Sequence, residues 1–381
     1  MDSEEVGPIG ITPPRRRRPA LRAVIVIAVI IIVALLLLTP AAQGFLRDLI
    51  ASPFRERYPA SATFTLERSV IIDPNAGEVV GYNVDISVPD TIMQNGYTLQ
   101  EVTSINYSPS VTTSEVRYGQ DWITWDSNET FSGHARELTA TFQMTVSTHV
   151  WDIDESNSLT ISDVPAPLKA QYLNDEWKIE MTDPSVVATS KAIVGSETDV
   201  YLILKNIYDW MLKNIDYPTF TSSGGPQSAS YTLSSGVGDC DDQSILFCAL
   251  ARAAGVPAWL QMGALLVTAE NNWGGHGWLQ AYVPLAGGGG ERVTIDVVNK
   301  DFLVFRPNRF VDFTDDGNAD HLTDYYSINI ISYNSSRPPP SFTETYTALS
   351  YHESSEKITR GTVYSAELLT PAGTARAKIR I

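Results

Sequence analysis

The chain has 381 residues, of which 43% are hydrophobic and 19% are charged, so it contains enough apolar material for a large folded core. Its formal net charge is −17 and its isoelectric point is about 4.7. Because nucleic-acid binding requires clustered lysine and arginine against the phosphates, this excess of acid argues against a nucleic-acid partner. The length predicts two or three domains.

The N-terminal region differs from the rest of the chain. Residues 15–18 are consecutive arginines, and residues 23–42 contain no charged side chain. A helix of that length measures about 30 Å, the thickness of a bilayer's hydrocarbon core. A cleaved signal peptide has a shorter apolar segment, so we expect an uncleaved, single-pass transmembrane helix at 23–42. By the positive-inside rule, residues 1–22 are a cytosolic arm and the remaining chain lies outside the cytosol, at the cell membrane.

The next part of the sequence has the period of β-strands. Residues 43–60 are a short stalk in this interpretation. Segments such as 61–72, 80–88 and 137–148 then alternate apolar and polar residues and are rich in Val, Ile, Thr, Tyr and Phe. Alternation of this kind is typical of antiparallel strands with one buried face, so residues 61–180 are predicted to form a β-sandwich domain.

From about residue 181 the apolar residues take helical spacing, and strand-like segments follow. We therefore expect an α+β domain over residues 181–335, and a small β tail over 336–381. Asp239 or Cys240 is placed to cap the third helix, and the glycines at 287–290 are placed to turn between the last two strands. The predicted helices are 183–195, 200–216 and 240–255, and the predicted strands are 256–268, 277–284 and 291–298.

The chain has two cysteines, Cys240 and Cys248. On one helix their eight-residue separation corresponds to about 12 Å along the axis, whereas the Cα atoms of a disulfide lie within about 7 Å. Both are therefore expected to be free thiols. Cys248 has the position of a core residue. Cys240 is flanked by acids in 236-GVGDCDDQS-244, which is the wrong charge to favour a thiolate.

Two further residues explain how Cys240 can still be reactive. His276 begins a predicted strand in 274-GGHGWLQAY-282, and Asp296 lies on the next strand in 292-RVTIDVV-298. A hairpin would bring the histidine and the aspartate together, and a helix that begins at Cys240 can point its N-terminus at them. An imidazole and a helix N-terminus both favour a thiolate, and a carboxylate behind the imidazole orients it. The sequence therefore predicts a nucleophile, a base and an orienting acid, in that order.

These motifs resemble those of the transglutaminase-like superfamily. The resemblance rests on G-x-G-D-C-D-D-Q-S, the helix ending A-R-A-A-G-V-P-A, the later H-G-W-L-Q-A-Y and T-I-D, and the earlier 207-IYDWMLKNIDY-217. It covers roughly residues 181–335. It implies a papain-like α+β fold in which Cys240 is the nucleophile, His276 the general base and acid, and Asp296 the orienting carboxylate. Two departures, Trp259 where the family commonly has arginine and Val297 where it often has proline, leave the substrate open.

The sequence therefore predicts a membrane-anchored, extracytosolic thiol enzyme that transfers or hydrolyses acyl groups at amide bonds of a protein or peptide. A cysteine peptidase that acts on envelope peptides fits the same residues. A non-catalytic protein that binds a ligand or organises the envelope is the alternative from another class. The residues do not determine the acyl acceptor or the oligomeric state.

No cofactor is expected. A zinc site on Cys240, His276 and an acid would need ligands more dispersed than structural zinc motifs have. The segment 312-DFTDDGNAD-320 has a faint likeness to a calcium loop, but threonine occupies the third and twelfth positions, so an acidic turn is the better interpretation. Trp273 and Trp278 flank the histidine and either line a channel or pack. Gln227 and Tyr231 are positional candidates for a second oxyanion donor.

Overall fold

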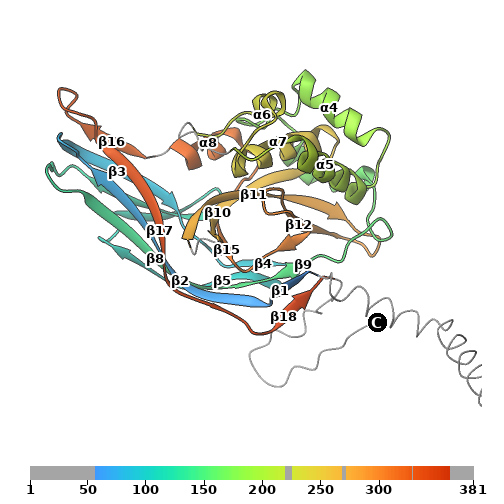
Figure 1. Ribbon diagram of the computed structural model, residues 1–381, viewed down its shortest axis with the longest axis horizontal. Helices are drawn as coiled ribbons and strands as arrows, with labels where there is room; N and C mark the ends of the chain where they lie inside the picture. Colours follow the sequence, from blue (N-terminus) through green and yellow to red (C-terminus); the bar gives the residue numbers. More distant parts are fainter. Residues whose placement is uncertain (1–55, 219–224, 268–271, 328, 361–381) are drawn as a thin grey trace, which may run out of the picture. The chain divides into compact units, whose positions relative to one another are not determined.

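The computed structural model describes residues 56–218, 225–267, 272–327 and 329–360 (Figure 1). From Arg57 onward the chain forms one compact unit. Within the described ranges, no helix is both long and apolar enough to cross a membrane. The transmembrane helix predicted at 23–42 lies outside the described residues, as does most of the predicted stalk.

One antiparallel sheet of ten strands organises this unit. The 13-residue strand β2 pairs with β8 along most of its length, and β8 buries alternate residues from Leu138 to Val146, as the period-2 pattern predicted. The sheet order is β13-β12-β11-β17-β2-β8-β5-β4, and β10 pairs with both β11 and β15. The bounds are β2 Ser61–Asp73, β4 Ile92–Gln94, β5 Tyr97–Ser108, β8 Arg136–Ser147, β10 Ala258–Val267, β11 Asn272–Pro284, β12 Gly290–Asp296, β13 Asp301–Phe302, β15 Arg309–Thr314 and β17 Ser341–Glu353.

Three smaller sheets complete the β structure. A four-stranded sheet has the order β16-β3-β7-β6, and two short pairs join β1 to β18 and β9 to β14. Buried side chains of the four-stranded sheet, including Trp122 and Trp125, belong to the same hydrophobic core as those of the ten-stranded sheet. The bounds are β1 Arg57–Pro59, β3 Val79–Ser87, β6 Thr113–Arg117, β7 Gln120–Ser127, β9 His149–Val150, β14 Val304–Phe305, β16 Ile330–Tyr333 and β18 Lys357–Thr359.

The helices gather beside β10, β11 and β12 (Figure 1). The three helices predicted between 183 and 255 are present with ends close to the predicted ones, and Asp183, Asp199 and Asp239 cap them through side-chain oxygens. Helix α7 is buried from Asp242 to Arg252 and packs on β10 and β11. The bounds are η2 Ile161–Asp163, α3 Ala166–Tyr172, α4 Pro184–Val194, α5 Val200–Asn214, α6 Ala229–Ser235, α7 Cys240–Ala253 and α8 Ala319–Ser327.

Strand β17 joins parts of the chain that the sequence assigned to separate segments. It comes from the predicted tail, pairs with β2 of the predicted sandwich, and meets β11 of the predicted α+β domain at the pair Trp273–Tyr346. Residues 341–353 are therefore an interior strand of the main sheet (Figure 1). The boundaries predicted at residues 180 and 335 fall between elements, and strands on either side of them are hydrogen-bonded to each other in one sheet.

Candidate active site

Cys240 is the first residue of α7, where the backbone N–H groups of a helix have no intrahelical partner. The helix start is fixed by a capping box in which Asp239 and Asp242 each accept a hydrogen bond from the other's backbone N–H. Gly277 on β11 allows the helix to approach closely, because a Cβ there would lie 3.2 Å from Cβ of Asp241. The thiol is thereby held beside β11.

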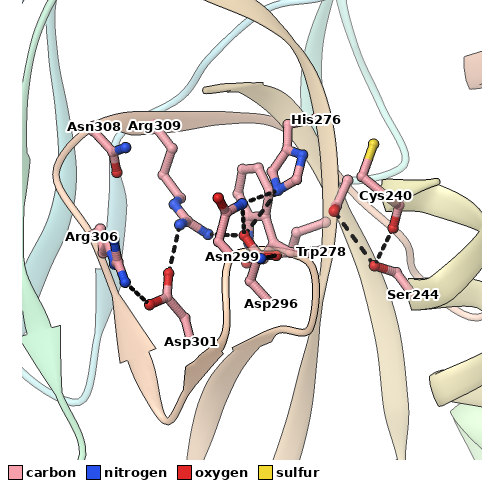
Figure 2. Close-up of polar contacts among 12 residues, drawn as sticks. Cys240, Ser244, His276, Trp278, Asp296, Asn299, Asp301, Arg306, Asn308 and Arg309 are labelled. Atoms are coloured by element: carbon pink, nitrogen blue, oxygen red, sulfur yellow. Dashed lines mark hydrogen bonds and ion pairs between the residues drawn. The ribbon is translucent and has the colours of Figure 1, made fainter. Parts of the chain in front are cut away.

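His276 and Asp296 come together as the predicted hairpin required. Strands β11 and β12 pair antiparallel from Leu279–Ile295 to Pro284–Gly290, so both residues lie just beyond the paired region. His276 Nε2 is 2.8 Å from Asp296 Oδ2, and the two side chains are buried. Figure 2 shows the other ring nitrogen, Nδ1, on the side of the ring that faces Cys240.

A network that sequence reasoning did not find surrounds the carboxylate of Asp296 (Figure 2). The Arg309 guanidinium donates to Asp296 Oδ2 at 2.9 Å and to Asp301 Oδ2 at 2.9 Å. Asn299 donates its backbone N–H to Asp296 Oδ1 and its side-chain Nδ2 to Oδ2. Asn299 follows Asp296 by only three residues, so a turn that joins the two could have been predicted from the local sequence. Arg309 lies on β15, and no pattern in the neighbouring sequence predicts its contact with Asp296.

The charges of this network shift the pKa of both central groups. Burial lowers the pKa of His276, but the adjacent Asp296 carboxylate and the Cys240 thiol outweigh burial and raise that pKa from 6.5 to about 10. Burial raises the pKa of Asp296, but His276 and Arg309 outweigh it and hold that pKa well below its usual range. An imidazolium paired with a carboxylate is therefore the state this geometry favours.

The acids around Cys240 have structural partners. Asp242 accepts a hydrogen bond from the backbone N–H of Gln227 at 2.6 Å, which ties the preceding loop to the helix. Asp241 Oδ2 accepts from the Tyr326 hydroxyl of α8 at 3.0 Å. Burial, followed by the neighbouring Asp241, raises the pKa of Asp239 to about 7, so this cap is only partly charged at neutral pH. These contacts explain the acids and reduce their opposition to a thiolate.

Cys240 and His276 open onto one cavity of about 490 Å³. One side of it is the glycine-rich start of β11, and another is β17, through Glu344, Thr345 and Tyr346. The cavity gives a substrate direct access to the thiol.

The remaining predicted residues have separate positions. Cys248 is fully buried in α7, Trp278 packs against the His276 ring, and Trp273 lines the cavity. Gln227 and Tyr231 are not among the described residues that line it.

The acids of the segment 312–320 point to separate partners. Asp312 pairs with Arg68, Asp315 with Arg252, and Asp316 with His321. Among the described residues, Asp239, Cys240 and Asp241 form the group whose ligand atoms lie within 4.8 Å of one another, but their hydrogen bonds already account for the two acids.

Comparison with known proteins identifies relatives of the segment around Cys240 and His276. Residues 187–290 match the family model described as the transglutaminase-like superfamily, a range that contains Cys240 and His276 and ends before Asp296. An uncharacterized protein of Haemophilus influenzae is 35% identical over 91 residues, which cover 23% of this chain and 25% of that protein.

Solved structures extend the similarity over more of the chain. A candidate cysteine protease from Cytophaga hutchinsonii matches with a TM-score of 0.53 and 14% identity, over 82% of this chain and 94% of that one. The periplasmic domain of TgpA from Pseudomonas aeruginosa is also similar, with a TM-score of 0.32 and 10% identity, over 66% and 91% of the two chains. At such identities the structural likeness concerns the fold. The family match therefore supports a transglutaminase-like domain in this chain, over the segment that carries Cys240 and His276.

Proposed function

We propose that this protein is a thiol enzyme that transfers or hydrolyses acyl groups at amide bonds of protein or peptide substrates, with Cys240, His276 and Asp296 as its triad. The observation that carries the proposal is the 2.8 Å contact between His276 and Asp296 beside a cysteine that opens onto the same cavity. We also propose that residues 23–42 anchor the enzyme at the outer face of a membrane.

The mechanism begins with an imidazolium at His276. The Cys240 thiolate attacks the amide carbonyl carbon, and the resulting tetrahedral intermediate collapses when His276 Nδ1–H gives its proton to the leaving amine. A thioester on Cys240 remains. A water or a second amine then attacks this thioester, His276 accepts the proton of that nucleophile, and the thiolate leaves. Asp296 keeps Nε2 protonated and holds the ring in place throughout.

The first test is the rate at which iodoacetamide alkylates Cys240 between pH 5 and pH 9, with Cys248→Ser as the background. We expect rapid alkylation at pH 6 that His276→Ala slows about ten-fold or more, because the variant lacks the imidazolium. Equal rates in the two proteins across this range would contradict an activated pair.

The second test separates the possible reactions. Casein is incubated with the enzyme and a fluorescent primary amine, with Cys240→Ala as the control. Fluorescence incorporated into casein indicates a transferase, and new peptide ends indicate a peptidase. The acid-rich surroundings of Cys240 favour a rival function, ligand binding without catalysis. A Cys240→Ala protein that retains the full biological activity of the wild type would establish that rival.

A further inference from the structure

The main sheet separates at the cavity. Strands β11 and β17 pair at Trp273–Tyr346, and β11 does not pair with β12 until Leu279. Between these points, the edge of β11 from Gly274 to Trp278 has no neighbouring strand among the described residues, and β17 lies across the cavity from it. Ser244 Oγ donates to the Gly277 carbonyl at 3.4 Å, so among the described residues the part of this edge that is open to a ligand is its start, at Gly274 and Gly275.

The glycines of β11 keep this space open. A Cβ atom added at Gly274 or Gly275 would meet no atom within 4 Å, so the absence of a side chain at these positions does not serve packing. Gly277 differs, since a Cβ there would press against Asp241. The opening between the two strands suits an extended chain, because such a chain can hydrogen-bond to a strand edge.

The walls of the cavity carry negative charge. Asp239, Asp241 and Glu344 line it, the His276 imidazolium is the cationic group beside Cys240, and none of the described lining residues is a lysine or an arginine. Glu344 differs from the other two acids because it comes from β17, opposite the catalytic helix. Its side chain is 33% exposed, so it can reach a bound molecule.

Glu344 is also held in a fixed position. Its Oε1 accepts from Nε of the buried Arg68 and from the Tyr346 hydroxyl at 3.1 Å, whereas Oε2 has no partner among the described residues. Arg68 shares its charge with Asp312, to which it donates at 3.0 Å. One guanidinium therefore contacts two carboxylates, and Oε2 of Glu344 is left to accept a hydrogen bond from a ligand.

We propose that the substrate is an extended peptide segment that lies between β11 and β17, and that Glu344 selects a cationic side chain, lysine or arginine, near the bond that is attacked. This inference rests on the proposed function, because it takes Cys240 as the reacting group. It assigns substrate selection to a strand outside the segment 187–290 that matches the family.

The test uses the full chain in detergent with Cys248→Ser and three probe peptides of sequence Ala-Ala-X-Cys-Ala-Ala, where X is Lys, Gln or Glu. The peptide cysteine carries a 3-nitro-2-pyridinesulfenyl group. The Cys240 thiolate attacks the peptide's cysteine sulfur, a disulfide forms, and the coloured nitropyridine thiolate leaves. The second-order rate of its release reports access to Cys240 without requiring hydrolysis.

We expect the Lys probe to react fastest and the Glu probe slowest. Glu344→Gln, which can still accept from Arg68, should lower the Lys-to-Glu rate ratio about five-fold, the size of one partly exposed charge pair. Glu353→Gln removes the same charge from the same strand outside the cavity, and should leave the ratio within about two-fold. Equal rates for the three probes, or a ratio that Glu344→Gln does not change, would overturn the assignment of Glu344.

Gly275→Leu tests the path of the peptide. A leucine side chain should fill the open space and slow all three probes about ten-fold, a clearly larger factor than the one by which it slows the small reagent iodoacetamide. Unchanged probe rates would refute binding between the strands. Failure of the proposed function has a different signature: Cys240 would react slowly with iodoacetamide in the wild-type protein, whatever the charge of the probe.

Discussion

Asp296→Asn should reverse the direction in which the protein shifts the pKa of His276. The folded protein raises this pKa from 6.5 to about 10, although burial alone lowers it. That increase corresponds to about 5 kcal/mol of favourable interaction with the imidazolium, at about 1.4 kcal/mol per pKa unit. Asparagine keeps the size of the side chain but removes its charge, so burial should dominate and the pKa should fall below 6.5.

NMR of protein labelled at the histidine Cε1 carbon measures this directly. The chain has five histidines, so the signals can be assigned one by one with His→Gln variants. His149 is an internal reference with the opposite shift, because its burial lowers the pKa to about 4. In the wild type, the His276 signal should not titrate between pH 5 and pH 9. In Asp296→Asn it should titrate below pH 6.5, and Cys240→Ala should lower the pKa by a smaller amount.

The same pair determines how stability depends on pH. Because the pKa of His276 is raised on folding, its stabilising contribution is complete below pH 6.5 and is lost as the pH rises toward about 10. Because the pKa of Asp296 is depressed, its contribution is present above about pH 4 and is lost in acid. Urea unfolding of wild type and Asp296→Asn should therefore differ most between about pH 4 and 6.5. A wild-type His276 that titrates near 6.5, or a variant that stays protonated at pH 8, would refute this reasoning.

Three further changes test other parts of the structure. Arg252→Met should lower the free energy of unfolding, measured in urea, by about 3–5 kcal/mol, because it leaves the buried side chains of Glu176 and Asp315 without their cation. Lys205→Met, at an exposed ion pair, should lower it by less than about 1 kcal/mol. Gly263→Ala should lower the free energy of unfolding by about 1–3 kcal/mol, because the added Cβ would lie 1.8 Å from the Phe310 carbonyl oxygen. The clash should also displace the neighbouring Arg309 on β15 and so slow Cys240 alkylation; equal stability of variant and wild type would contradict this contact. The wild type should lose about 3 kcal/mol of its free energy of unfolding as the pH falls from 6.5 to about 4, because buried His149 resists protonation. His149→Phe keeps the stacking on Tyr97 but cannot be protonated, so it should lack this loss, and parallel stability curves of the two proteins would argue against it.

The parts of the site that could be predicted are those with a local signature. An acid at the start of a helical pattern predicts a cap at the beginning of α7, which the structure shows at Asp239, and alternation around a glycine turn predicts the hairpin of β11 and β12. The hairpin brings His276 and Asp296 to neighbouring positions, and their side chains meet at 2.8 Å. Arg309 could not be predicted in the same way, because its position depends on β15 pairing with β10, more than forty residues earlier in the chain.

The role of β17 was hidden for a related reason. Its alternating residues predict a strand, but which strand it pairs with depends on burial of the whole sheet, which the local sequence does not encode. The sequence therefore predicts only a small β tail over 336–381, whereas this segment supplies an interior strand and one wall of the cavity. Tertiary pairing placed Glu344 opposite a cysteine more than one hundred residues earlier.

The proposed reacting groups and the residue proposed to select the substrate lie in different segments of the chain. Cys240 and His276, the proposed nucleophile and base, lie within the segment that matches the family model, so the proposal for their chemistry rests on motifs shared with other proteins. Glu344 and Tyr346 lie outside that segment and face the same cavity. A change on β17 can therefore alter which peptide is accepted and leave the distance between His276 and Asp296 unchanged. For this reason, a relative that aligns over residues 187–290 alone is informative about the reacting groups but not about the substrate.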